Sequence, residues 1–305
     1  MENKLKKPKS FGEILDLTFN LSKNRFKEFF TILLILNGPV YLIEAIVQLL
    51  SGTSFFREVG TGNSWIEKIA AGFEGSANNT NISGDIGVIV VAFIGFFLFP
   101  VSEAAILLTI DHIRKNEEFT PVSVIKRGFS RFWPMLGSDI VFGLIAFSMV
   151  LVPIMVVVLT GVFGSMISPF LGIPLAILFF LGFAVGVGYL LTRWSFYFGS
   201  VVIDKDAPGI SRSWTLTKGR TWVLMALYLI FYVIISGINM AVQMTLGIFL
   251  GNSVLLSIIS NITTLFSTLV FSVGYGVIYL DLKIRHDADD LKQMIEDYNK
   301  IKPIS

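Results

Sequence analysis

The chain has 305 residues, of which 53% are hydrophobic and only 15% charged. A soluble domain usually carries about 25% charged residues, so this composition excludes an ordinary soluble protein. The absence of Cys excludes disulfides and thiolate metal sites. The formal net charge of +2 gives no reason to expect a nucleic-acid partner.

Long apolar stretches dominate the chain from about residue 29 onward. Each is long enough to cross about 30 Å of hydrocarbon as a helix of about 20 residues. The pattern therefore predicts an all-α integral membrane protein with six transmembrane helices. No cleavable signal peptide is expected, because the first apolar stretch follows a long basic leader. The predicted spans cover residues 29–50, 86–110, 135–160, 170–198, 223–250 and 254–280.

The basic residues fall almost entirely on one side of the predicted membrane. Of the 24 Lys and Arg residues, only Arg57 and Lys68 lie in segments on the opposite side from the N-terminus. Cytoplasmic loops carry the excess of Lys and Arg, so both termini are predicted to be cytoplasmic, in the plasma membrane. The expected partners of these cations are anionic lipid headgroups.

A short amphipathic segment precedes the first, third and fifth spans. The first opens with Ser10 and Glu13, a capping box, and the second with Thr120 and Pro121, an N-cap and first helical position. We predict three hairpins, each preceded by a cytoplasmic interfacial helix. A threefold repeat and the general need for interfacial anchors both account for this pattern. The predicted anchors are Trp133, Trp214, Trp222 and Arg220.

Two segments lie outside these repeated units. An outer loop over 51–85 joins the first two spans, and apolar residues within it are expected to dip into the interface. Residues 286–305 place Leu291, Met294 and Ile295 at helical spacing among acidic residues, which predicts a short cytoplasmic amphipathic tail. Residues 1–285 would then form one six-span membrane domain.

Four ionisable side chains inside the spans are the candidate functional residues: Glu44, Glu103, Asp139 and Arg193. A charge at bilayer depth costs a few kcal/mol or more, so such residues are usually paired or functional. Counting along the helices places the last three in the inner half of the membrane and Glu44 towards the outer side. We expect Arg193 to pair with Glu103 or Asp139 as a structural ion pair; the alternative is a polar floor for a solute or lipid-headgroup pathway.

Glycine and proline residues in the spans predict local packing. Gly182 with Gly186, and Gly247 with Gly251, have the spacing that permits close helix approach. Pro39, Pro100, Pro153 and Pro174 are expected to kink or break their helices, as packing devices or as sources of free carbonyl groups.

Catalytic signatures are missing from this sequence. The two His residues, His112 and His286, are expected at the cytoplasmic boundary, far from a buried nucleophile. Neither a metalloprotease pattern nor a phosphate-binding Gly loop is present. We therefore expect no catalysis by this chain alone, no metal and no cofactor.

Three interfacial patterns resemble the membrane domain of bacterial glycerophosphoryl diester phosphodiesterases. They are the Ser10–Asp16 run with Phe19 and Phe26, the Ser-x-x-Trp-x-Leu-x-Lys-Gly-Arg-x-Trp stretch over Ser211–Trp222, and the exit Tyr279-x-Asp281-x-x-x-Arg285. The resemblance covers most of the chain. It implies the standalone membrane half of that family, without the catalytic barrel, in a bacterial plasma membrane. No catalytic residue carries over, because no His-Arg-Gly run is present.

Two classes of function follow. The first is a non-catalytic scaffold, anchor or lipid-associated protective protein, whose basic cytoplasmic rim receives a membrane or cytoplasmic protein such as an ATPase or a phosphodiesterase. The second is a permease or transporter subunit with a polar pathway between the hairpins. A continuous polar cavity reaching Glu44 would favour transport, and a paired or tightly packed Glu44 would favour the scaffold.

Overall fold

The computed structural model describes residues 5, 7–56, 82–251 and 253–301, and all regular structure in them is helical. Six helices are long and apolar enough to cross a membrane, which confirms the predicted number. Most of the predicted outer loop over 51–85 lies outside the described residues. The six helices are α2 (Phe26–Leu50), α4 (Ile82–Lys115), α6 (Phe132–Ile167), α7 (Pro169–Trp194), α10 (Thr221–Leu250) and α11 (Val254–Ile301).

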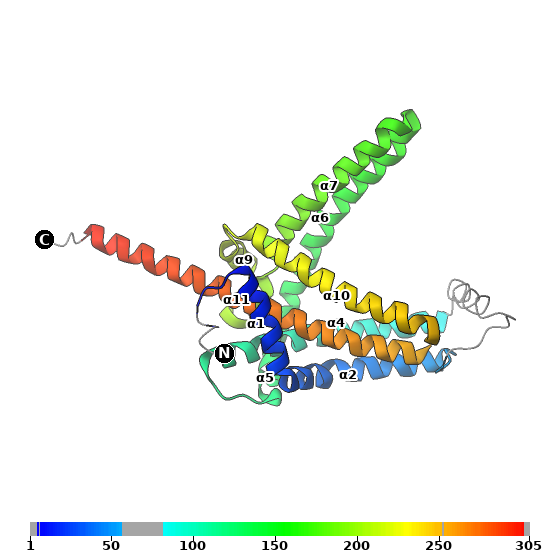
Figure 1. Ribbon diagram of the computed structural model, residues 1–305, viewed down its shortest axis with the longest axis horizontal. Helices are drawn as coiled ribbons and strands as arrows, with labels where there is room; N and C mark the ends of the chain where they lie inside the picture. Colours follow the sequence, from blue (N-terminus) through cyan, green and yellow to red (C-terminus); the bar gives the residue numbers. More distant parts are fainter. Residues whose placement is uncertain (1–4, 6, 57–81, 252, 302–305) are drawn as a thin grey trace.

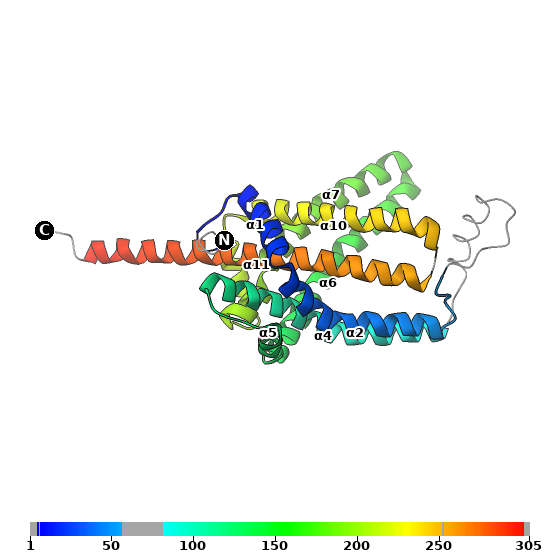
Figure 2. The same cartoon turned by 60° about the horizontal axis from the view of Figure 1, so that its bottom comes forward.

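Four of these helices, α2, α4, α10 and α11, lie side by side and form what we call the four-helix body (Figures 1 and 2). Its buried apolar side chains gather in the half of the body near the N-terminus, where α1 (Phe11–Asn24) packs across α11 and α2. We call this half the terminal end of the body. Its largest fully buried side chains include Phe29, Ile106, Phe231 and Tyr279.

Helices α6 and α7 form a second unit, the α6–α7 pair, which projects away from the body at an angle (Figure 1). The two helices are joined at Ser168 and pack against each other. Apolar side chains along the pair are widely exposed, including Phe170 at 92% and Met166 at 78%. Hydrocarbon solvates such side chains at no cost, so an unpaired apolar surface is compatible with a membrane helix.

Three short helices surround the terminal end of the body. In α1, the Ser10 side chain accepts from the backbone of the first turn and the Glu13 carboxylate accepts from the Ser10 N–H, so the predicted capping box is confirmed. In α5 (Pro121–Phe129), Thr120 is the N-cap and Pro121 the first helical residue, again as predicted. The third short helix is α9 (Ile210–Leu216).

Close helix approach in the α6–α7 pair depends on different glycines from those predicted. A Cβ on Gly172 would lie 2.2 Å from the backbone of Gly164, so the absence of both side chains lets the two helices touch. Gly182 and Gly186 have nothing within 4 Å of a built Cβ, so the expectation of close approach there was wrong. Gly247 meets only ordinary side-chain contacts.

The helices run further than their apolar stretches. The sixth is continuous from Val254 to Ile301, so residues 286–301 of the predicted tail over 286–305 are an extension of α11 rather than a separate short helix. Polar residues extend a helix readily once its first turns are fixed, because each added residue gains a backbone hydrogen bond. None of the four prolines breaks its helix: Pro39, Pro100, Pro153 and Pro174 each lie inside an uninterrupted helix.

Candidate functional site

A cavity of about 290 Å³ lies where the α6–α7 pair leaves the four-helix body. Its wall combines acidic, hydroxyl and aromatic side chains from α4, α6, α10, α11 and the residues that follow α7. We call it the carboxyl pocket. It is lined by Pro100, Glu103, Asp139, Phe142, Ser195, Tyr197, Phe198, Tyr228, Phe271, Ser272 and Tyr275.

The two carboxyl groups of the pocket come from different helices. Glu103 lies on α4 and Asp139 near the start of α6, so the structure brings together two of the four predicted intramembrane candidates. The Tyr197 hydroxyl donates to Asp139 Oδ1 at 2.7 Å, and the Tyr197 ring stacks on Phe142. Among the described residues none donates a hydrogen bond to Glu103, whose oxygens are therefore available to a ligand that carries N–H or O–H groups.

The fourth span is interrupted beside the carboxyl pocket. Helix α7 ends at Trp194, and the chain continues as the short helix α8 (Tyr197–Gly199) and the π-helical turn η2 (Ser200–Asp204). A break at membrane depth frees backbone groups that need partners. Here the Phe196 N–H donates to Ser213 Oγ at 3.0 Å, and the Gly199 N–H to the Tyr275 hydroxyl at 2.9 Å.

Tyrosine hydroxyl groups complete the polar wall. Tyr228 lies 3.0 Å from Ser195 Oγ, and the Tyr275 hydroxyl donates to the Ser195 carbonyl at 3.1 Å. These residues were not among the sequence candidates. The available signal was the spacing of Tyr275 and Tyr279, one helical turn apart in the sixth span.

Glu44 lies outside the carboxyl pocket, near the far end of α2. Its carboxylate accepts from Gln48 at 3.1 Å and from Asn261 of α11 at 3.0 Å. It lines neither this cavity nor the one described below. Glu44 therefore has the role of a hydrogen-bonded link between α2 and α11.

The expected pairing of Arg193 with Glu103 or Asp139 was wrong. The Arg193 guanidinium donates to the Trp214 carbonyl at 2.7 Å and lies 3.5 Å over the centre of the Trp214 ring. Stacking of a guanidinium on an indole is a favourable cation–π contact. Helix α9, which carries Trp214, packs against the end of α7. Arg193 therefore contacts the Trp214 carbonyl and ring instead of a carboxylate.

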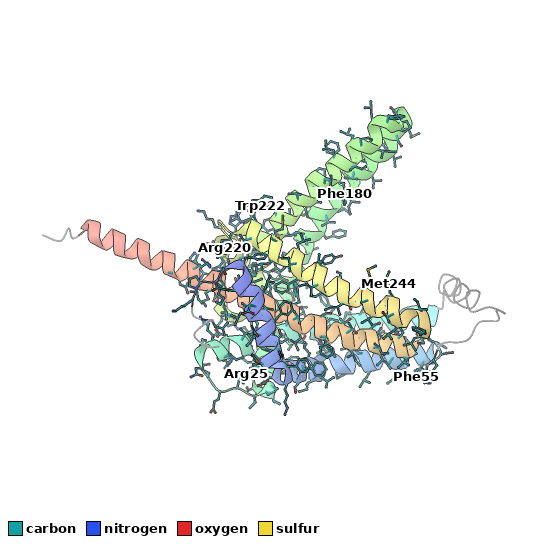
Figure 3. The ribbon with its side chains drawn as sticks, in the orientation of Figure 1. Arg25, Phe55, Phe180, Arg220, Trp222 and Met244 are labelled. Atoms are coloured by element: carbon teal, nitrogen blue, oxygen red, sulfur yellow. The ribbon has the colours of Figure 1, made fainter. Side chains whose placement is uncertain are left out.

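The predicted interfacial anchors lie towards the terminal end of the molecule. Trp133 and Trp222 are 76% and 60% exposed at the starts of α6 and α10. Trp214 is covered in part by Arg193, and Arg220 contacts Asp281 at 3.4 Å. Arg220 and Trp222 lie towards this end of the body, whereas Phe55 and Met244 mark the opposite end (Figure 3).

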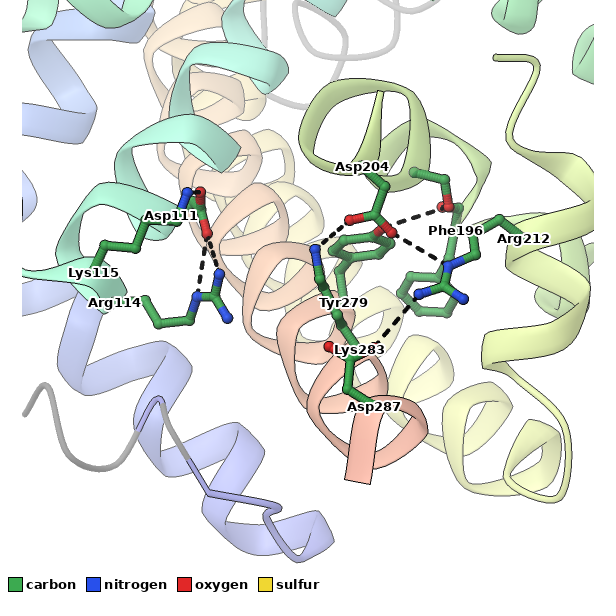
Figure 4. Close-up of polar contacts among 10 residues, drawn as sticks. Asp111, Arg114, Lys115, Phe196, Asp204, Arg212, Tyr279, Lys283 and Asp287 are labelled. Atoms are coloured by element: carbon green, nitrogen blue, oxygen red, sulfur yellow. Dashed lines mark hydrogen bonds and ion pairs between the residues drawn. The ribbon is translucent and has the colours of Figure 1, made fainter. Parts of the chain in front are cut away.

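Largely buried aspartates follow the second, fourth and sixth spans and bind nearby cations. Asp111 accepts from Arg114 and Lys115, each at 2.7 Å. Asp204 accepts from the Tyr279 hydroxyl at 2.8 Å and forms an ion pair with Lys283, both of which lie on α11 (Figure 4). The fourth-span aspartate was missed by the sequence reasoning, although an apolar residue followed by Asp ends all three spans.

Asp281 is the most deeply buried of the three. It is 2% exposed and accepts from the Lys9 N–H at 2.7 Å, from Arg285 at 2.9 Å and from Arg220. Arg285 in turn donates to the Lys9 carbonyl at 2.6 Å. These contacts fix the segment before α1 to α11. The charged residues that follow the second, fourth and sixth spans therefore have a structural role.

Within the described ranges, no group of three His, Asp or Glu side chains is arranged to hold a metal ion. Fold and composition together indicate a multi-pass α-helical membrane protein, and in its described part the carboxyl pocket lies at a helix break. Comparisons with protein-family models, curated proteins and solved structures give no match.

Proposed function

We propose that this chain is a non-catalytic, lipid-associated protein of a bacterial plasma membrane, and that the carboxyl pocket binds the polar end of a cationic amphiphile. The observation that carries the proposal is the pocket at the junction of the α6–α7 pair and the body, where Glu103 and Asp139 face a common cavity. Within the described residues no Lys or Arg forms an ion pair with either carboxyl group.

The chemistry of the lining supports this class of ligand. A primary ammonium group has three N–H donors, and the pocket offers two carboxyl groups and several hydroxyl oxygens as acceptors. Phe142, Phe198 and Phe271 supply apolar surface for the first part of an alkyl chain. A cation bound there would compensate negative charge in a low-dielectric setting, where such pairing is strong.

The proposal includes a membrane topology. Three hairpins would cross the bilayer with both termini cytoplasmic, and α1, α5 and α9 would lie as amphipathic helices at the inner interface. Support comes from the basic segments and from Trp133 and Trp222, which are exposed at helix starts as interfacial Trp residues usually are. We also propose that an ATPase or a phosphodiesterase docks on this basic rim. The chain would be related to the membrane domains of the glycerophosphoryl diester phosphodiesterases.

Transport is the second candidate, favoured by the helix break. Broken membrane helices often line substrate sites, and the break after Trp194 lies at the carboxyl pocket. Two observations favour simple binding instead. Glu44 is hydrogen-bonded away from the pocket, and none of the four prolines interrupts its helix.

Photolabelling with a long-chain alkyl amine that carries a diazirine tests the proposal. The protein would be held in phosphatidylcholine nanodiscs and the labelled peptides identified by mass spectrometry. We expect labels on Phe142, Phe198 or Phe271, about tenfold more than with an alkyl alcohol of equal length, because one strong ionic contact is worth about 1.4 kcal/mol or more.

The double variant Glu103→Gln with Asp139→Asn should lose this preference for the amine. Glu44→Gln is the matched control, because it neutralises a hydrogen-bonded intramembrane carboxyl outside the pocket. Equal labelling by amine and alcohol, or equal loss in the control, would contradict the proposal.

A further inference from the structure

A second cavity, of about 430 Å³, lies closer to the terminal end along the same seam between α4 and α6. We call it the basic pocket, because four of its lining residues are cationic and one is acidic. Its cations come from the end of α4, from α5 and the turn after it, and from the residue after η2. It is lined by Ala104, Leu108, Asp111, Lys115, Arg127, Gly128, Ser130, Arg131, Met135, Val202, Ile203 and Lys205.

The single carboxylate of the basic pocket is already occupied. Asp111 accepts from Arg114 and from Lys115, so it contributes little negative potential to the cavity. Arg127, Arg131 and Lys205 form no ion pair within the described part of the chain. The cavity therefore holds an excess of positive charge that an anionic group would compensate.

Neutral partners hold the two arginines in position. Arg127 Nη1 lies 3.2 Å from His112 Nε2, and His112 Nδ1 lies 2.6 Å from the Leu108 carbonyl. The carbonyl can only accept, so Nδ1 carries the proton and Nε2 accepts from Arg127. Arg131 Nη1 donates to the Val201 carbonyl at 3.4 Å. Each guanidinium keeps further N–H donors for a ligand, since neither partner uses more than one nitrogen.

The start of α6 adds to the positive potential. Arg131 is the N-cap of this 36-residue helix, and its first turn contains no acidic residue. The N-terminal end of a long helix carries a partial positive charge, which favours an anion. Guanidinium groups beside a helix N-terminus form a suitable arrangement for the oxygens of a phosphate group.

Apolar residues form the opposite wall of the basic pocket. This wall is the floor of the pocket, and its helices continue into the apolar part of the molecule. It consists of the buried residues Ala104, Leu108, Met135 and Val202. A soluble phosphate would gain nothing from such a floor, whereas acyl chains would.

We infer that the basic pocket binds the phosphate group of an anionic phospholipid of the inner leaflet, with Arg127, Arg131 and Lys205 as its ligands. Cationic pockets between membrane helices at the cytoplasmic boundary are suited to such headgroups. This inference uses a different cavity from the proposed function. Its failure would leave the amine-binding test of the carboxyl pocket unaffected.

Native mass spectrometry of the full chain, titrated with phosphatidylglycerol, measures this binding directly. We expect Arg127→Gln with Arg131→Gln to weaken binding roughly 30-fold, because each cation near the membrane surface contributes about a fivefold effect. Lys205→Asn should weaken it about fivefold. Asn tolerates the left-handed backbone of Lys205 (φ 64°), so this variant removes the charge without backbone strain. It also leaves the contact between Arg131 and the Val201 carbonyl in place.

Lys126→Gln is the matched control, because Lys126 is an exposed cation on α5 that does not line the pocket. Binding by this control should stay within about twofold of the parent chain, and an excess of inorganic phosphate should not displace the lipid. Equal weakening by Lys126→Gln would mean general surface attraction and overturn the inference. Displacement by inorganic phosphate would overturn the assignment to a lipid.

Discussion

The four-helix body and the α6–α7 pair are both built from apolar helices, yet they are held in place differently. The body has a buried core and is tied at its terminal end by Asp204 and Asp281. The pair contributes only Met135 to that core and exposes most of its side chains. In lipid, exposure of apolar surface costs nothing, so polar contacts and small-residue packing decide where a helix lies.

The contacts between the two regions are concentrated at the base of the pair. Ser195 with Tyr228 and the Tyr189 ring with the Trp222 ring join the end of α7 to the start of α10. The contacts of Tyr197 with Asp139 and of Arg131 with Val201 lie beside this junction. The carboxyl pocket lies at this same junction. The proposed binding site therefore lies where the pair begins to separate from the body.

The largest effect is expected from removing the central anchor of the body. Asp281→Ala would remove the acceptor of the Lys9 N–H and the carboxylate that pairs with the guanidinium groups of Arg220 and Arg285. Breaking a buried ion pair costs about 3–5 kcal/mol, and the two arginines are 26% and 31% exposed, so we expect about 3 kcal/mol. SDS-driven unfolding in mixed micelles measures the loss.

Asp287→Ala is the control for that experiment. Asp287 is 57% exposed and has one contact with Arg212 at 3.7 Å, so its loss should change the free energy of unfolding by less than about 0.5 kcal/mol. If both variants unfold alike, the polar anchoring of the body is not what distinguishes it from the pair.

A smaller effect is expected within the α6–α7 pair. Gly172→Ala would place a methyl group 2.2 Å from the Gly164 backbone, and the resulting separation of the helices should cost about 2 kcal/mol. Gly182→Ala, with open space around its Cβ, should cost nothing. The same unfolding measurement applies, and equal stability of the two variants would show that the pair does not depend on close approach at its tip.

Sequence reasoning could predict the features that depend on composition along the chain. Six apolar helices, the capping residues of α1 and α5, and a similar depth for Glu103 and Asp139 along their helices all follow from hydropathy, local residue pattern and helical rise. Two further features were readable but missed. They are Asp204 after the fourth span and the Tyr275–Tyr279 spacing.

Other features depend on contacts between distant segments. Nothing local in Trp194, Ser195 and Phe196 predicts the end of α7, because no Gly or Pro stands there. The break is satisfied by Ser213 and Tyr275, which are remote in sequence. The partner of Arg193 was missed for the same reason, since it depends on where α9 returns.

The most direct test of the account asks whether the α6–α7 pair crosses the same bilayer as the body. The chain has no Cys, so single cysteines can be introduced cleanly. In intact cells an impermeant maleimide should label Met166→Cys at the tip of the pair and Phe56→Cys after α2, but Glu117→Cys and Asp206→Cys only after permeabilisation. If Met166→Cys is instead labelled only after permeabilisation, the pair does not span the membrane and the carboxyl pocket is not an intramembrane site.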